Sequence, residues 1–163
     1  MRFKRGSKVE VMIKEEVMTS WRCAEIISGN GHTYNVRYDC YLGTTSIAAI
    51  ERVSRKFIRP CPPPVEGVQS WLAGDIVEVF DDNSWKTAAI SKVVYGEEYY
   101  VVRLLGATQE FRVHKLSIRV RMSWQYDKWV VIGKLTFLSR FDLFYFLFFY
   151  FFIYIKSLAS IED

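Results

Sequence analysis

One arrangement of residues occurs twice in this chain, and the duplication constrains the fold more than any other feature of the sequence. Residues 6–11 (GSKVEV) recur as residues 74–79 (GDIVEV), residues 21–26 as 85–90, and residues 34–37 as 100–103, and the copies close with the pairs Ile58-Arg59 and Ile118-Arg119. The offset between matching blocks varies, so insertions and deletions lie between the blocks, where loops are expected. The chain therefore contains two copies of one small module.

Within each copy the apolar residues follow a period of two, which predicts β-strands. Val9, Val11 and Ile13 alternate with more polar neighbours, and Gly, Asn and Asp residues separate the apolar blocks at residues 28–31 and 81–83. Four or five short strands per copy are expected. A module of this length cannot stack two full sheets, so a bent sheet that closes on itself is the favoured way to bury one face. We predict an all-β chain with two small barrels side by side.

The connection between the copies is rich in proline. All four prolines of the protein lie within residues 60–64. Proline lacks an N–H donor and fixes φ, so this stretch is expected to be an extended, stiff connector. The predicted organisation is repeat 1 at 3–60, a linker at 61–70, repeat 2 with a closing strand at 71–134, and an aromatic-rich tail at 135–163.

The residues that enzymes and metal sites need are scarce. Cys23, Cys40 and Cys61 form no C-x-x-C spacing, which argues against a zinc site or a disulfide framework. His32 and His114 lack a partner at metal-binding or catalytic spacing, and no phosphate-binding loop or nucleophile elbow occurs. The net charge of +4 is mildly basic and dispersed, so it indicates nucleic-acid binding only weakly. We expect no catalytic residues, no metal and no cofactor.

Aromatic residues near strand ends offer a binding chemistry instead. Ala24 and Ile26 share one parity in a predicted strand, so Trp21 starts on the opposite side, and Trp85 does the same in the second copy. Several ring faces beside a carboxylate attract a methylated ammonium, so methyl-lysine or methyl-arginine is the predicted ligand. The alternative is that these rings fill the barrel cores, especially Tyr34, Tyr99 and Tyr100, which lie within predicted strands. The candidate cage residues are Trp21, Tyr38, Asp39, Tyr41, Phe80, Asp82, Trp85 and Tyr100.

The repeated blocks resemble the tandem Agenet domains of plant proteins, a Tudor-like branch of the Royal superfamily. The resemblance covers roughly residues 3–134 and lies in the ordered repetition of several blocks. It implies two five-stranded Tudor-like (SH3-like) barrels, a nuclear location, no catalysis, and binding of methylated histone tails or other methylated proteins through an aromatic cage. The two copies are not expected to bind alike, because Met12 stands where the second copy has Phe80, and Leu104 stands where the first has Tyr38.

The leading hypothesis is therefore a non-enzymatic chromatin reader. The alternative is an RNA- or DNA-binding module, because several cations lie near the ends of the repeats and could line one face. Its candidate residues are Arg55, Lys56, Arg59, Arg119 and Arg121.

The C-terminal tail differs from the rest of the chain in composition. Eight of the twelve phenylalanines fall between Phe137 and Phe152, and residues 143–155 are uncharged and dominated by aromatics. A third hypothesis is that residues 143–155 anchor the protein in a membrane, but the segment is shorter than a bilayer span of ~20 residues. Its residues are those of T-rich codons, so we interpret 135–163 as translated intron sequence rather than as a tail anchor.

Overall fold

The computed structural model describes residues 2–14, 18–39, 50–65, 70–94, 96 and 98–132. The cage candidate Tyr41 and the tail interpretation for 135–163 fall outside these residues. Residues 1–133 form one compact unit, which holds both repeats. Within the described ranges, no helix has the length and apolar character needed to cross a bilayer.

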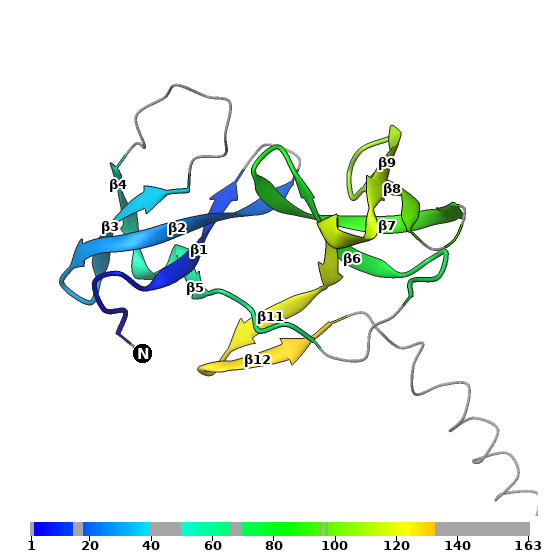
Figure 1. Ribbon diagram of the computed structural model, residues 1–163. Coiled ribbons are helices and arrows are strands. Elements are labelled where there is room, and N and C mark those ends of the chain that lie inside the picture. Colours follow the sequence, from blue (N-terminus) through cyan, green and yellow to red (C-terminus); the bar gives the residue numbers. More distant parts are fainter. Residues whose placement is uncertain are drawn as a thin grey trace, which may run out of the picture. The chain divides into compact units, whose positions relative to one another are not determined.

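The first repeat is a five-stranded antiparallel sheet, drawn from blue to cyan-green in Figure 1. Its elements are β1 (Lys8–Lys14), β2 (Thr19–Gly29), β3 (Thr33–Tyr38), β4 (Ile50–Ser54), the 3-10 turn η1 (Arg55–Phe57) and β5 (Ile58–Pro60). The strands pair in the order β5-β1-β2-β3-β4. Pro60 lies on β5, an edge strand that pairs only with β1 among the described strands, and edge strands are where a sheet tolerates proline. Residues 61–65 continue from β5 without regular secondary structure.

The second repeat has the same elements in the same order. They are β6 (Ile76–Asp81), β7 (Ser84–Val94), β8 (Tyr99–Leu104), β9 (Glu110–His114), the 3-10 turn η2 (Lys115–Ser117) and β10 (Ile118–Val120). The long strand of each repeat also has a register shift at the equivalent place. The shift lies between Ile26 and Ser28 in β2 and between Ile90 and Lys92 in β7. The predicted all-β fold with five strands in each repeat is thus confirmed.

Each repeat has its own core, and many positions of the two cores correspond. Val9 matches Val77 and Ala24 matches Ala88, and all four are fully buried. Burying a valine side chain contributes roughly 1.5–3 kcal/mol, so each core contributes much of the stability of its repeat. The period of two therefore identified the buried face correctly.

A buried tyrosine fixes the entry of the chain into each core. The Tyr34 hydroxyl accepts a hydrogen bond from the backbone N–H of Phe3 at 3.2 Å, and the Tyr100 hydroxyl accepts one from Trp71 at 3.3 Å. Tyr100 is 0% exposed. Its assignment to an open cage was therefore wrong, because its ring fills the core while its hydroxyl satisfies a buried N–H; the core-filling alternative holds for this residue.

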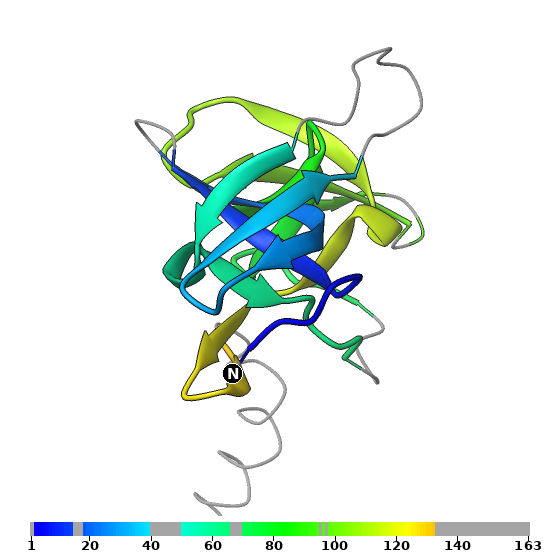
Figure 2. The same cartoon turned by 90° about the vertical axis from the view of Figure 1, so that its left-hand side faces the viewer.

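The two repeats are joined by direct strand pairing. Trp21 on β2 lies opposite Trp85 on β7 in antiparallel register, and Ser20 lies opposite Lys86. This pairing makes one continuous ten-stranded sheet, in which β2 and β7 each serve both repeats. Figures 1 and 2 show the two long strands, blue and green, next to each other where the repeats meet.

A two-stranded hairpin follows the second repeat, where a single closing strand was expected. It consists of β11 (Met122–Gln125) and β12 (Lys128–Val131), yellow in Figure 1. Its two turn residues, Tyr126 and Asp127, both have positive φ, which is typical of a type I′ hairpin turn. Met122 joins the second core, and the rings of Trp124 and Trp129 lie 5.2 Å apart across the hairpin.

Candidate functional site

A row of four cross-strand side chains runs over the junction of the repeats. Met12 lies opposite Trp21, Trp21 opposite Trp85, and Trp85 opposite Phe80. Directly opposed residues of antiparallel strands point to the same face, so the row lies on the face away from both cores. The parity argument placed Trp21 and Trp85 on that face, and both are half-buried there.

Four charged side chains, which we call the Glu/Arg tetrad, fill the junction beside this row. Glu10 and Arg59 are cross-strand partners on β1 and β5, and Glu78 and Arg119 are partners on β6 and β10. Glu10, Glu78 and Arg59 are 4% exposed or less. Each repeat thus contributes one carboxylate and one guanidinium at equivalent positions, and the four charges cancel.

The tetrad also links the repeats directly. The Arg59 Nε donates to Glu10 at 2.8 Å and its Nη2 donates to Glu78 at 3.0 Å, while the Arg119 Nε donates to Glu78 at 2.8 Å and its Nη1 donates to Glu10 at 2.6 Å. Each arginine therefore binds both carboxylates, one from its own repeat and one from the other repeat. A buried charge is tolerated when it is paired and hydrogen-bonded in this way.

The same two arginines cover the tryptophans. The Arg59 guanidinium lies 3.8 Å from the Trp21 ring centroid, and the Arg119 guanidinium lies 3.9 Å from that of Trp85. Cation–π contacts of this kind use one ring face of each indole. A ligand cation at either tryptophan must therefore bind to the part of the indole ring that the arginine does not cover.

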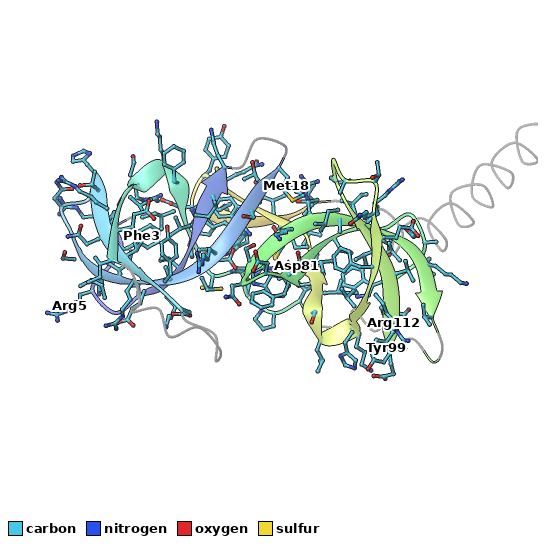
Figure 3. All side chains as sticks on the ribbon, turned by 90° about the horizontal axis from the view of Figure 1, so that it is seen from above. Phe3, Arg5, Met18, Asp81, Tyr99 and Arg112 are labelled. Carbon is cyan, nitrogen blue, oxygen red and sulfur yellow. The ribbon has the colours of Figure 1, made fainter. Side chains whose placement is uncertain are left out.

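In the second repeat, three predicted cage residues come together at the β6–β7 turn. The rings of Phe80 and Trp85 are 5.1 Å apart and tilted by 58°. Asp82 follows in the turn with a φ of 46°, is exposed, and has no ion-pair partner among the described residues. The neighbouring Asp81 binds Lys86 at 2.7 Å. Figure 3 shows Asp81 close to the junction of the repeats.

In the first repeat, the predicted cage residues are separated. Tyr38 is 8% exposed, and its hydroxyl donates to Glu51 at 2.7 Å. The Arg22 guanidinium covers its ring at 5.0 Å from the centroid. Burial and the Glu51 carboxylate raise the pKa of the Tyr38 phenol well above its ordinary value. Asp39 accepts a hydrogen bond from Lys8 at 2.9 Å. With these partners, Tyr38 and Asp39 do not form a common site with Trp21.

The five cations proposed for nucleic-acid binding divide into two sets. Arg59 and Arg119 belong to the Glu/Arg tetrad. Arg55, Lys56 and Arg121 instead line a groove of about 470 Å³, which we call the basic groove. Its remaining lining residues are Met12, Thr19, Trp21, Ile58, Arg59, Glu78, Thr87, Met122, Ser123, Trp124 and Ile132.

A larger groove of about 750 Å³ lies at the equivalent place in the second repeat. Lys115 and Leu116 of η2 line it where Arg55 and Lys56 of η1 line the basic groove. Residues 62–65 line only the larger groove, whereas Ser123 and Trp124 of β11 line only the basic groove. The two grooves therefore differ in charge and in the segments that line them.

The sequence interpretation missed two features. Glu10 looked like a solvated member of an alternating strand, and neither Glu78 nor Trp124 was considered for a site. The recurrence of a glutamate at the same place in both copies, and of an arginine after Ile58 and Ile118, is the signal from which the tetrad could have been found.

Comparison with known proteins is consistent with this geometry. The Agenet domain family matches residues 6–63. The Arabidopsis thaliana protein "DUF724 domain-containing protein 3" is 27% identical over 134 residues, which cover 78% of this chain and 19% of that protein. This chain thus spans about a fifth of the length of the curated relative that it matches.

Two solved structures share the fold. The crystal structure of Arabidopsis thaliana AGDP1 AGD34 has a TM-score of 0.70 at 20% identity, over 79% of this chain and 89% of that one. The crystal structure of the ADCP1 tandem Agenet domain 3-4 has a TM-score of 0.67 at 19% identity, over 79% of this chain and 87% of that one. The resemblance to tandem Agenet domains is confirmed.

Proposed function

Residues 6–63 match the Agenet domain family and the two repeats share the fold of tandem Agenet domains; from this premise we propose that the chain is a non-catalytic reader module. Its proposed ligand is a methylated lysine or arginine in a protein tail, with a histone tail as the leading candidate. A nuclear, chromatin-associated location goes with this proposal.

The second repeat is the proposed binding repeat. The observation that carries this proposal is the tilted Phe80–Trp85 ring pair at 5.1 Å, with the exposed Asp82 in the turn that joins the two strands. Two ring faces attract a methylated ammonium, which has lost much of the hydration that competes with ring contacts. The carboxylate adds attraction for the positive charge. Asp81 already binds Lys86, so Asp82 is the proposed charged partner.

The first repeat is proposed to support the module rather than to bind a methylammonium. Its row ends in Met12 instead of an aromatic ring. The Tyr38 ring is buried under Arg22, and four cations and one carboxylate line the groove next to Trp21. These charges are positive overall and repel a cationic ligand.

Peptide binding tests the proposal. The full chain is applied to an array of histone peptides that carry mono-, di- or trimethylated lysines and methylated arginines, and the hits are measured by calorimetry. Phe80→Ala is expected to weaken binding of a methylated peptide about tenfold, because one wall of the cage is lost. The matched control is Met12→Ala, at the equivalent position of the first repeat, which should change binding less than twofold.

Salt dependence separates this proposal from nucleic-acid binding. Contacts to several phosphates lose orders of magnitude in affinity as salt rises, whereas cage binding falls modestly. The nucleic-acid hypothesis has less support, because Arg59 and Arg119 are committed to the tetrad. A chain that ignores every methylated peptide but binds single-stranded RNA with a steep salt dependence would contradict the reader proposal.

A further inference from the structure

The basic groove is not used by the proposed methylammonium site. Four cations and one carboxylate line it: Arg55, Lys56, Arg59, Arg121 and Glu78. Arg59 and Glu78 bind each other at 3.0 Å, so they contribute no net charge. Lys56 and Arg121 form no ion pair with a carboxylate among the residues that the structure describes, so the groove presents positive charge to a ligand, in contrast to the carboxylates at the β6–β7 turn.

Two of the cations are held by the first repeat itself. The Arg55 Nη1 donates to the Ile58 carbonyl at 3.1 Å, and its guanidinium lies 4.7 Å from the Phe3 ring centroid. The Lys56 ammonium lies 5.0 Å from the Phe57 ring centroid. These contacts already restrict the two side chains in the free protein, so binding a ligand costs less side-chain entropy.

The third cation comes from the second repeat. Arg121 lies between β10 and β11, is half-buried, and forms no ion pair with any carboxylate in the described part of the chain. It meets Arg55 and Lys56 only because the strand pairing and the tetrad bring the two repeats together. The groove is therefore a property of the tandem and not of either repeat alone.

The size of the charge cluster favours one anion over a chain of phosphates. Single-stranded nucleic acid is bound along a basic track that follows several successive phosphates. Here Arg59 and Arg119, which would extend such a track, are neutralised in the tetrad, and the three remaining cations share one groove of about 470 Å³. Arginine is suited to a phosphate group because its planar fork donates two parallel hydrogen bonds.

We propose that the basic groove binds the phosphate of a phosphoserine or phosphothreonine side chain in an extended peptide. A phosphate carries close to two negative charges and three strong acceptor oxygens, which match two guanidinium groups and one ammonium. Trp21 and Trp124 line the same groove and offer apolar surface to the neighbouring peptide residues. This inference rests on the proposed function only in taking a protein tail as the partner, and it places the phosphate at a separate groove.

The experiment uses peptides without methylated residues, so that its result does not depend on the cage. The full chain is applied at physiological salt to degenerate peptide libraries with a fixed phosphoserine, phosphothreonine or unmodified serine, and selected peptides are measured by calorimetry. The proposal predicts retention of phosphorylated peptides and at least tenfold weaker binding of their unmodified forms. Equal binding of both forms overturns it.

Charge-removing variants locate the site. Arg121→Gln and Lys56→Gln are each expected to weaken phosphopeptide binding about tenfold. Arg103→Gln and Lys92→Gln remove the same charges from exposed strand positions of the second repeat and should change it less than twofold. All four residues lie outside the tetrad, and circular dichroism verifies the folding of each variant.

Two outcomes overturn the proposal even if phosphopeptides bind. One is an equal loss of affinity in Arg103→Gln and Arg121→Gln, which means attraction by overall charge. The other is tighter binding of a uridine octamer than of any phosphopeptide, with the same loss in Arg121→Gln, which assigns the groove to nucleic acid. Phe80→Ala leaves phosphopeptide binding unchanged if the two sites are separate, so failure of the cage proposal and failure of this one are distinguishable.

Discussion

The two repeats share an interior and differ on the surface that they present to a partner. Val9, Ala24 and Tyr34 are buried in the first repeat, and Val77, Ala88 and Tyr100 are buried in the second. On the junction face, however, the row ends in Met12 in the first repeat and in Phe80 in the second, and the basic groove contrasts with the carboxylates at the β6–β7 turn. The two copies therefore agree in the core residues that stabilise the fold and differ at outer positions that a partner could contact.

The largest expected effect is at the tetrad, where the two repeats depend on each other. Glu78→Ala leaves two mostly buried guanidinium groups with one carboxylate, and breaking a buried ion pair costs about 3–5 kcal/mol in unfolding free energy. Glu10→Ala should cost about the same, because the two positions are equivalent. Urea unfolding followed by tryptophan fluorescence measures both.

The matched control for the tetrad is Glu25→Ala. Glu25 binds Arg37 at 3.2 Å with both side chains partly exposed, so its loss should cost less than about 1 kcal/mol. A Glu78→Ala protein that loses no more stability than Glu25→Ala would show that the tetrad does not hold the repeats together.

A smaller effect is expected from removing the buried tyrosine hydroxyls. Tyr34→Phe and Tyr100→Phe each leave a buried backbone N–H without its acceptor, at a cost of about 1–3 kcal/mol. Thermal unfolding of both variants should give similar losses, since the two hydrogen bonds are equivalent. A loss in only one variant would mean that the cores are less alike than their contacts indicate.

The next effect sharpens the difference between the repeats. Met12→Phe places a second aromatic ring beside Trp21, as Phe80 lies beside Trp85. Binding of a methylated peptide should still not appear in the first repeat, because the cations of the basic groove repel the ligand. In a Phe80→Ala background, recovery of methyl-peptide affinity by Met12→Phe, measured by calorimetry, would contradict this explanation.

The smallest effect concerns an exposed pair found in the first repeat. Lys8 donates a hydrogen bond to Asp39, which raises the pKa of the Lys8 ammonium above 10.5. Because the pKa of Lys8 is higher in the folded state, its ammonium stabilises the folded protein at pH values below 10.5. This contribution is lost as the pH rises through the folded-state pKa. Because Lys8 is largely exposed, Lys8→Met should cost less than about 1 kcal/mol at neutral pH.

The check is urea unfolding of Lys8→Met and the natural chain over a pH series. The difference between them should shrink as the pH rises above the unfolded-state pKa of lysine. A difference that stays constant up to pH 12 would assign the effect to packing of the lysine stem instead.

Sequence patterns found the strands but misjudged several polar and aromatic residues. Glu10 alternates with Val9 and Val11, so it was expected on the solvent face, and in an isolated barrel that face is exposed. The second repeat covers it, which converts a surface position into a buried ion pair. Arg59 and Arg119 were considered for phosphate contacts because they lie near the ends of the repeats, but both bind the tetrad carboxylates instead.

The candidate site was predicted in part. Phe80, Asp82 and Trp85 were named from the sequence, and the β6–β7 hairpin brings them together because its strands are adjacent along the chain. Tyr38 was named with them, but it contacts Arg22 and Glu51 through pairing with other strands. Local spacing cannot reveal such contacts.

The sequence alone determined the duplication, the strand pattern and the buried face of each barrel, because these follow from local spacing and from the need to bury apolar side chains. Only the tertiary structure decided that β2 pairs with β7, that Glu10 meets Arg119 across 109 positions of the chain, and that Arg121 joins Arg55 in one groove. The physical reason is that a charged residue on an outer face can be solvated equally well at many places. Its partner depends on which surfaces of the two repeats contact each other. The sequence of one repeat alone does not reveal that interface.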